Sequence, residues 1–163
     1  MHIVLKNKFL HYRHYKIKCA VGKRGISENK IEGDYCTPKG EFVFEYLMYR
    51  KDRVKKIKTN IPKMIIKKNM GWCDDPSSKK YNKLIKFPFS DRAEKLFLKK
   101  DSYDLLLIIN YNRKPTIPYK GSAIFLHIAN KKFSPTKGCI AINKVDFIKI
   151  LPLLRKKTKI RII

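Results

Sequence analysis

One histidine and one cysteine in this chain have the spacing of a thiol nucleophile and its base. His127 lies in the apolar run 125–129, and Cys139 begins another apolar run after a loop that contains Pro135 and Gly138. A free cysteine, with a pKa of about 8.5, is only a few per cent ionised at neutral pH, and a neighbouring histidine raises the reactive fraction. The pattern predicts adjacent strands that bring imidazole and thiol side by side.

The turn before Cys139 carries two further residues that suit acyl transfer. Gly138 permits close approach of the backbone, so that the amides around the cysteine can point at a developing oxyanion. Thr136 adds a hydroxyl to the same turn. Spacing alone also leaves open that His127 and Cys139 are ordinary core residues.

The elements that must position this pair read mainly as short strands. Short strands with few helices favour a β-sandwich over a βαβ architecture. Residues 50–70 show no clear pattern. Apolar alternation predicts strands at 15–21, 37–47, 103–111, 122–129, 139–142 and 158–163, and helical spacing predicts short helices at 90–98, capped by Ser90, and at 145–151, ended by Pro152.

Composition limits the classes of partner. At 163 residues and 44% hydrophobic content, we expect one domain with a sizeable core. A net charge of +26 would ordinarily indicate nucleic acid as a partner. The basic residues, mostly lysine, are spread along the whole chain without a clustered patch or reading motif, so composition bias is the better explanation and nucleic acid is not an expected partner. Salt-sensitive attraction to an acidic polymer or anionic surface stays open.

No membrane span or export signal is expected. The longest apolar run, 105–109, is far shorter than the roughly 18 residues that a spanning helix needs. The first eleven residues lack the apolar core of a secretory signal. As written, the chain fits a cytoplasmic protein, a processed chain or a misplaced start codon, and the compartment stays open.

The cysteines fit neither a zinc site nor an obvious disulfide framework. No C-x-x-C pair exists, and His11 and His14 have no cysteine nearby, so no metal is expected. Cys19 lies in an apolar run and is predicted to be a buried thiol. Whether Cys36 and Cys73 form a disulfide stays open.

The segment 71–76 holds the only tryptophan, Trp72, and two adjacent acids, Asp74 and Asp75. Paired acids beside a tryptophan suit recognition of a substrate amine. The alternative is a loop anchored by Trp72, with a turn at Asp75 and Pro76. Both interpretations stay open at this point.

These residues together resemble the L,D-transpeptidase catalytic domain of bacterial cell-wall enzymes, the YkuD-type domain. Its signature is a histidine, a variable loop, then Ser or Thr, any residue, Gly and Cys, which His127 and the segment 136–139 match. The segment Thr37–Phe42 is similar to the family's Thr-Pro-x-Gly-x-Phe element. The resemblance is clearest over residues 15–163 and indicates a compact subgroup made almost wholly of the catalytic domain.

The resemblance implies that residues 1–163 form one mainly β domain, an L,D-transpeptidase-like β-sandwich of mixed sheets with one or two short helices. No cofactor and no metal is implied. Ala141 departs from the pattern, because many members carry Arg or Asn there, so a nearby cation would have to hold the substrate carboxylate or oxyanion. The implied site consists of Cys139 as nucleophile, His127 as general base and acid, and the Gly138 backbone as oxyanion donor, with Thr136, Lys137, Trp72, Asp74 and Asp75 as candidate substrate-binding residues.

The implied reaction is a ping-pong acyl transfer on peptidoglycan tetrapeptide stems. Cys139 attacks the carbonyl carbon of the peptide bond between a diamino acid and the terminal D-alanine. D-alanine leaves, and the remaining thioester then reacts with an acceptor. An amine acceptor gives the 3-3 cross-link of an L,D-transpeptidase, whereas water gives an L,D-carboxypeptidase of cell-wall recycling. Implied partners are stem peptides or muropeptides and carbapenem-type acylating inhibitors. A non-catalytic, basic binding module on the same scaffold is the third interpretation.

Overall fold

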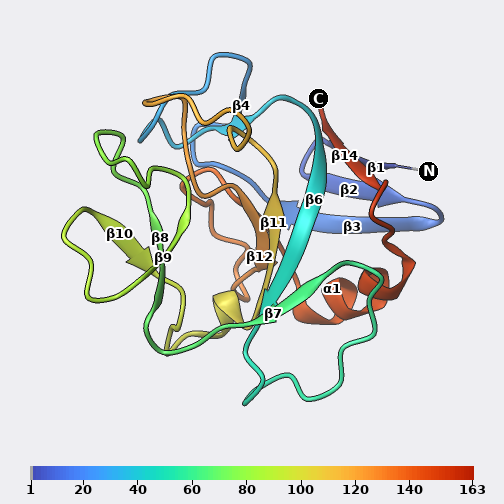
Figure 1. Ribbon diagram of the computed structural model, residues 1–163. Helices are drawn as coiled ribbons and strands as arrows, with labels where there is room; N and C mark the ends of the chain where they lie inside the picture. The colour runs from blue at the N-terminus through green and yellow to red at the C-terminus, as the bar shows by residue number, and fades with distance from the viewer. Residues whose placement is uncertain (1) are drawn as a thin grey trace.

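Strands dominate the computed structural model, which describes residues 2–163 (Figure 1). One α-helix, α1 (Lys144–Ile150), and two 3-10 turns, Asp101–Tyr103 and Leu151–Leu153, complete the regular structure of this part of the chain. None of the helices among residues 2–163 has the length and apolar character needed to cross a membrane. The strands are β1 (Ile3–Lys6), β2 (Phe9–Tyr12), β3 (Tyr15–Ala20), β4 (Ile26–Ser27), β5 (Thr37–Pro38), β6 (Gly40–Tyr49), β7 (Lys63–Ile65), β8 (Met70–Cys73), β9 (Leu84–Lys86), β10 (Ala93–Lys95), β11 (Leu105–Ile109), β12 (Phe125–Ile128), β13 (Ile140–Ile142) and β14 (Lys159–Ile162).

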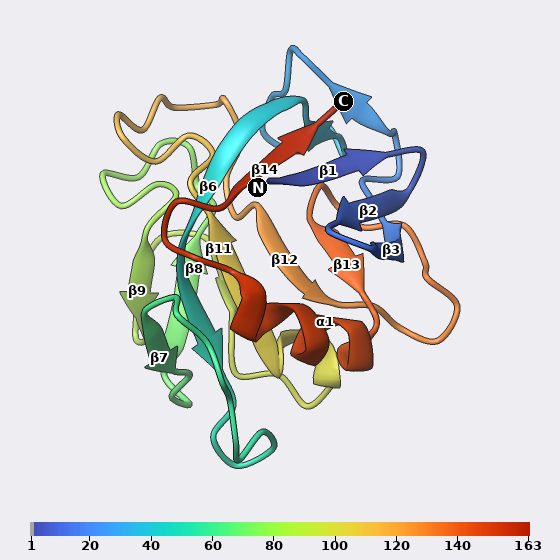
Figure 2. The ribbon, with the colours of Figure 1, turned by 90° about the vertical axis from the view of Figure 1, so that its right-hand side faces the viewer.

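The main sheet closes on itself through the long strand β6. Nine strands follow the order β11-β12-β13-β3-β2-β1-β14-β6-β7, and β6 also pairs with β11 (Figure 2). Residues 40–43 of β6 pair with β14, and residues 44–49 pair with β11, so this one strand joins β14 to β11 and closes the ring. The ring contains two parallel pairs, β12 with β13 and β1 with β14, and its other pairs are antiparallel, which confirms the predicted mainly β fold of mixed sheets.

Strand β11 separates two apolar clusters. All five of its residues are buried, as expected for a strand that is covered on both faces. Leu105 and Leu107 point into the larger core, whereas Leu106 and Ile108 point into a smaller cluster that contains Trp72. The period of two along a strand therefore builds both clusters from one apolar run.

The predicted C-terminal helix is confirmed as α1. The Asn143 side chain caps it by accepting a hydrogen bond from the Asp146 N–H at 2.9 Å. Phe147 and Ile150 are its buried residues, and a 3-10 turn containing Pro152 follows directly. The helix thus ends where proline removes a backbone donor.

The helix predicted at 90–98 is wrong. Residues 93–95 form strand β10, which pairs antiparallel with β8 in a small sheet of order β10-β8-β9. Ser90 donates a hydrogen bond to the Asp91 carboxylate rather than capping a helix. Pairing with a strand about twenty residues earlier overrides the local helix preference of Ala, Glu and Lys. The strands predicted at 15–21, 37–47, 103–111, 122–129, 139–142 and 158–163 each contain an observed strand.

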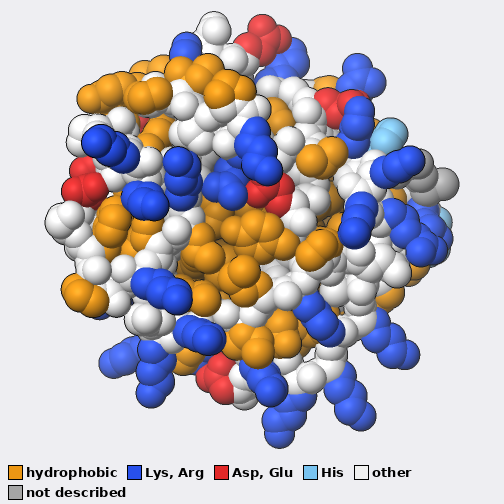
Figure 3. Space-filling view, viewed as in Figure 1, with side chains coloured by type: hydrophobic (Ala, Val, Ile, Leu, Met, Phe, Trp, Pro, Cys, Tyr) orange, Lys and Arg blue, Asp and Glu red, His pale blue; other side chains and the backbone are white. Residues whose placement is uncertain are grey.

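Lysine and arginine side chains are scattered over the face of the molecule in Figure 3. They stand among apolar and neutral side chains, and acidic side chains are few on this face. The dispersed charge agrees with the distribution of lysine along the sequence.

Candidate active site

Strands β12 and β13 place His127 and Cys139 at the same cleft. The two strands pair in parallel, with His127 opposite Ala141. Cys139 comes two residues before Ala141, so the period of two directs both side chains toward one face. Both residues line a cleft of about 770 Å³. The structure therefore brings the imidazole and the thiol into one site.

Cys139 is a partly exposed thiol held by two backbone groups. Its Sγ donates to the Ala123 carbonyl oxygen at 3.0 Å and accepts from the Phe125 N–H at 3.4 Å. Burial raises the pKa of Cys139 to about 12, and the negative charge of Glu94 acts in the same direction. The Phe125 N–H and Lys30 act in the opposite direction. The cleft therefore favours the protonated thiol, and forming the thiolate requires a base or a compensating charge.

His127 has the tautomer that its predicted role as a general base needs. Its Nδ1 lies 3.0 Å from the Ile128 carbonyl oxygen, which only accepts hydrogen bonds, so we assign the proton to Nδ1. Nε2 is then left unprotonated. Burial lowers the His127 pKa, and the ring packs edge-on against Tyr103 with centroids 5.4 Å apart. A neutral, oriented imidazole can accept the thiol proton.

The turn before the cysteine is shaped by Thr136. Its hydroxyl donates to the Cys139 carbonyl oxygen at 2.6 Å and accepts from the Gly138 N–H at 3.1 Å. Gly138 has φ +140°, and a Cβ there would lie 2.8 Å from the Cys36 carbonyl oxygen. Conformation and space both require glycine. The Gly138 N–H, predicted as an oxyanion donor, is engaged by Thr136 in this structure.

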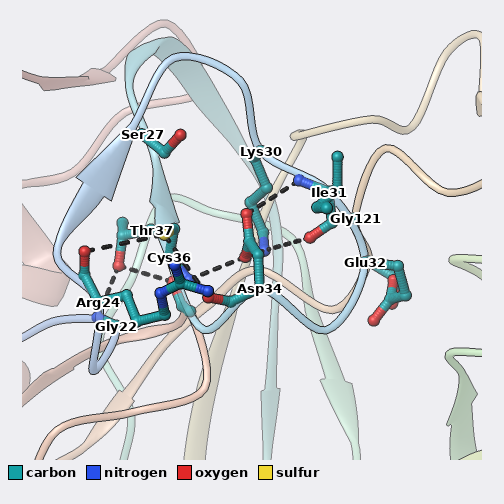
Figure 4. A network of polar contacts seen from close by, with 12 residues as sticks. Gly22, Arg24, Ser27, Lys30, Ile31, Glu32, Asp34, Cys36, Thr37 and Gly121 are labelled. Atoms are coloured by element: carbon teal, nitrogen blue, oxygen red, sulfur yellow. Dashed lines mark hydrogen bonds and ion pairs between the residues drawn. The ribbon is translucent and has the colours of Figure 1, made fainter.

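The Thr-Pro element is tied directly to this turn by Thr37. Its completely buried hydroxyl accepts from the Gly22 N–H at 2.9 Å and donates to the Gly138 carbonyl oxygen at 2.9 Å, 101 residues away in the sequence. Figure 4 shows Thr37 beside Cys36, with Gly22 close by. The two sequence motifs are therefore parts of one hydrogen-bonded unit.

Lys30 supplies a buried cation beside the same turn. Its side chain is 4% exposed, and Nζ donates to Asp34 Oδ1 at 2.6 Å and to the Ile31 carbonyl oxygen at 3.2 Å (Figure 4). Nζ lies 3.6 Å from the position of a Cβ on Gly138. Sequence reasoning missed Lys30, because nothing local distinguishes it from the other lysines. It is a cation of the kind that the departure at Ala141 calls for.

Two glutamates that sequence reasoning also missed line the cleft. Glu94 on β10 accepts a hydrogen bond from the Tyr103 hydroxyl at 2.9 Å, and burial raises its pKa to about 7. Glu32 accepts hydrogen bonds from the hydroxyls of Tyr81 and Ser122. The sequence analysis predicted a helix at 90–98, and nothing in that prediction placed Glu94 in a site.

The predicted substrate-binding residues divide into two groups. Thr136, Lys137 and Asp74 line the cleft, and Asp74 pairs with Arg92 at 3.1 Å. In the described chain, Trp72 and Asp75 are not among the residues that line it.

The position of Trp72 agrees with the alternative interpretation, in which this tryptophan anchors a loop. It is completely buried, its Nε1 donates to Asn82 Oδ1 at 3.0 Å, and its ring packs edge-on against Phe125 with centroids 5.0 Å apart. Asp75 accepts hydrogen bonds from the Ser77 N–H and hydroxyl, which forms the predicted turn. A large apolar ring gains more from this pocket than from a solvent-facing wall, which is why Trp72 lies in the core.

All four cysteines are free thiols, so Cys36 and Cys73 do not pair in this structure. Cys19 is buried, as predicted, and burial raises its pKa to about 12. Among residues 2–163, no group of three His, Cys, Asp or Glu side chains is placed to hold a metal ion.

Fold and cleft together define a mainly β domain in which a Thr-Pro element supports a cysteine turn next to a histidine. A scan of protein families matches residues 3–162 to YkuD, the L,D-transpeptidase catalytic domain. The chain therefore belongs to the L,D-transpeptidase catalytic domain family, as the resemblance predicted, a family that acts on peptidoglycan. Searches of curated proteins and of solved structures gave no match.

Proposed function

We propose that this protein is a cysteine-dependent L,D-transpeptidase that acts on peptidoglycan tetrapeptide stems, releases D-alanine and forms 3-3 cross-links. The observation that supports it is the shared cleft of Cys139 and His127, with the cysteine turn tethered to Thr37, in a chain of this family. The domain that carries the reaction is residues 1–163.

Acylation starts with proton transfer within the pair. The Cys139 thiol gives its proton to Nε2 of His127, and the sulfur attacks the carbonyl carbon between the diamino acid and D-alanine. The carbon–nitrogen bond then breaks, and the imidazolium returns the proton to the departing amine. D-alanine leaves, and the acyl group stays on Cys139 as a thioester.

Backbone amides of the cysteine turn are the proposed oxyanion donors. Each such donor typically contributes about 3 kcal/mol to transition-state stabilisation. The Gly138 N–H is donated to Thr136 Oγ1 at 3.1 Å, so this amide must exchange the hydroxyl for the substrate oxygen during the reaction. The Thr136 hydroxyl, which still donates to the Cys139 carbonyl oxygen, can then accept a hydrogen bond from the substrate, as its predicted binding role requires.

The second half-reaction depends on the acceptor. An amine of a second stem attacks the thioester and restores the Cys139 thiol, which gives a cross-linked dimer. Water attacking the same thioester gives a tripeptide, the L,D-carboxypeptidase outcome. The lysines at the cleft, Lys30 and Lys137, are the proposed contacts for a substrate carboxylate in either case.

Mass spectrometry of a purified disaccharide-tetrapeptide tests the proposal. Wild-type protein is compared with Cys139→Ala and with Cys36→Ala, which removes the other partly exposed cysteine. We expect loss of one D-alanine with wild type and Cys36→Ala, and none with Cys139→Ala. Dimers indicate transpeptidation, and monomeric tripeptide indicates carboxypeptidation.

No D-alanine release from folded, reduced wild-type protein would reject tetrapeptide stems as substrates. Salt-sensitive polymer binding without turnover would then favour the basic binding module. Acylation of Cys139 by a carbapenem, detected as a mass increase on its peptide, reports separately on whether this thiol is the nucleophile.

A further inference from the structure

The catalytic cleft holds carboxylates that escape ion pairing in a very basic protein. The chain has 39 Lys and Arg against 13 Asp and Glu, so cations are available almost everywhere. Among residues 2–163, eight ion pairs within 4.0 Å are formed, and none includes Glu94 or Glu32. Both unpaired glutamates line the cleft. A carboxylate that forms no ion pair within the protein at this site is free to meet a cation of the ligand.

Glu94 and Glu32 differ in how far their oxygens are occupied. One carboxylate oxygen of Glu32 accepts both the Tyr81 and the Ser122 hydroxyls, so Glu32 holds two segments of the chain together. Glu94 accepts only the Tyr103 hydroxyl, at 2.9 Å, among the side-chain contacts of the described chain. Glu94 therefore retains more capacity to accept hydrogen bonds from a ligand.

Glu94 is linked to the catalytic pair through Tyr103. The Tyr103 ring lies edge-on to His127, with centroids 5.4 Å apart, while its hydroxyl reaches Glu94. The position of Glu94 is fixed by β10, where it stands opposite Trp72 of β8. A carboxylate on a paired strand beside the catalytic histidine is a rigid feature of the cleft.

The charges that face Glu94 come from several elements. Tyr103 donates to it, Lys137 of the cysteine loop attracts its negative charge, and Asp74 and Glu32 repel it. Its charge in turn opposes ionisation of Cys139. A ligand cation placed here would offset that repulsion and favour the thiolate.

We propose that Glu94 determines specificity by binding the ammonium group of the diamino acid in the substrate, and that this contact couples substrate binding to activation of Cys139. The identity of the substrate rests on the proposed function, whereas the preference of the cleft for a cation does not. Above about pH 7, where Glu94 is mostly ionised, substrate binding replaces an unpaired anion with an ion pair in the cleft that holds Cys139. A stem without a free side-chain amine leaves the anion uncompensated and is processed slowly.

The first experiment needs no peptidoglycan. Cys139 is modified with cationic 2-aminoethyl methanethiosulfonate and with anionic 2-sulfonatoethyl methanethiosulfonate, and the rate is read from the mass of the peptide that contains Cys139. In both reactions the thiolate sulfur bonds to the reagent sulfur and methanesulfinate leaves, so only the reagent charge differs. We expect Glu94→Gln to lower the ratio of cationic to anionic rates about tenfold relative to wild type.

The matched control is Glu28→Gln. Glu28 is exposed, pairs with Lys39 and lies outside the cleft, so the same charge is removed at a distance. We expect its ratio to stay within about twofold of wild type. Each ratio is measured under conditions where fluorescence of the buried Trp72 shows the variant to be folded, because in an unfolded chain Cys139 reacts outside the cleft and the ratio falls for that reason alone. An unchanged ratio in Glu94→Gln would overturn the proposal.

The second experiment compares tetrapeptide stems with a free and an acetylated side-chain amine. We expect wild-type kcat/KM for D-alanine release to be at least about tenfold higher for the free amine, and Glu94→Gln to lose that preference. Equal rates for the two stems in wild type would refute the specificity role. If wild type releases D-alanine from neither stem, the proposed function fails, and the thiosulfonate ratio alone decides whether Glu94 attracts a cation to Cys139.

Discussion

The buried hydroxyl of Thr37 offers a sharp test of how Cys139 is positioned. Thr37→Val preserves the shape of the side chain and deletes Oγ1, which leaves the Gly22 N–H and the Gly138 carbonyl without their partner. Thr37 is completely buried, so water cannot replace the hydroxyl without rearrangement. Each unsatisfied buried polar group costs about 1–3 kcal/mol, and with two such groups we expect the free energy of unfolding to fall by about 2–6 kcal/mol.

The same substitution releases the turn that carries Cys139. Gly138 immediately precedes Cys139, the proposed nucleophile, and a displacement of about 1 Å at a reacting group can reduce the rate about 100-fold. We therefore expect kcat for D-alanine release to fall about 100-fold in Thr37→Val under conditions where the variant is folded. Urea unfolding followed by fluorescence of Trp72, the only tryptophan and completely buried, measures both the folded fraction and the stability.

Thr37→Ser is the matched control, because it keeps the hydroxyl and loses only a methyl group. We expect it to cost about 1 kcal/mol in stability and to retain most of the activity. Thr116→Val removes a hydroxyl that donates to the Arg113 carbonyl outside the cleft, and it should leave activity unchanged. Wild-type stability or wild-type kcat in Thr37→Val would refute the tether.

Three further predictions follow from individual contacts. Gly138→Ala places a Cβ 2.8 Å from a backbone carbonyl, and it should abolish D-alanine release, whereas Gly25→Ala, with open space around its Cβ, should cost only about 1–2 kcal/mol of left-handed strain in urea unfolding. Lys30→Met removes the ion-pair partner of the Asp34 carboxylate and should lower the free energy of unfolding by about 3–5 kcal/mol. Adding Asp34→Asn should recover part of this loss, and additive losses in the double-mutant cycle would contradict an interaction between Lys30 and Asp34. The pKa of Glu94 is raised from 4.5 to about 7 in the folded protein, so between these pH values the folded protein binds more protons than the unfolded chain. The free energy of unfolding should therefore fall as pH rises from 4.5 to 7. If Glu94→Gln shows the same decrease with pH, Glu94 is not its cause.

The features predicted correctly from the sequence are those encoded by local pattern. The run 105–109 is apolar throughout and forms the buried strand β11, and the helical spacing after Asn143 forms α1. His127 and Cys139 could be identified because each occurs at an apolar run next to turn residues. Their shared cleft follows from the parallel pairing of β12 and β13.

The features that sequence reasoning missed depend on contacts between distant segments. Lys30 matters because the loop 30–36 packs against the Gly138 turn, and one lysine among many gives no local signal. Glu94 enters the cleft only because residues 93–95 pair with β8, which local helix preference argued against. Trp72 is the opposite case: one of the two interpretations placed it in the cleft because acids lie next to it in the sequence, and the structure places it in the core.

The closed ring of strands has a consequence for how the protein is made. Strand β1 pairs in parallel with β14, which is synthesised last. Next to this pair, the Lys159 N–H donates to His2 Nδ1, 157 residues away in the sequence. During synthesis at roughly 5–20 residues per second, β1 and β6 therefore spend on the order of ten seconds or more with an unpaired edge. Unpaired edges invite aggregation, and a high density of lysine is one means by which proteins discourage it. The positive charge spread along the chain would then protect the nascent protein, in addition to any effect on its partners.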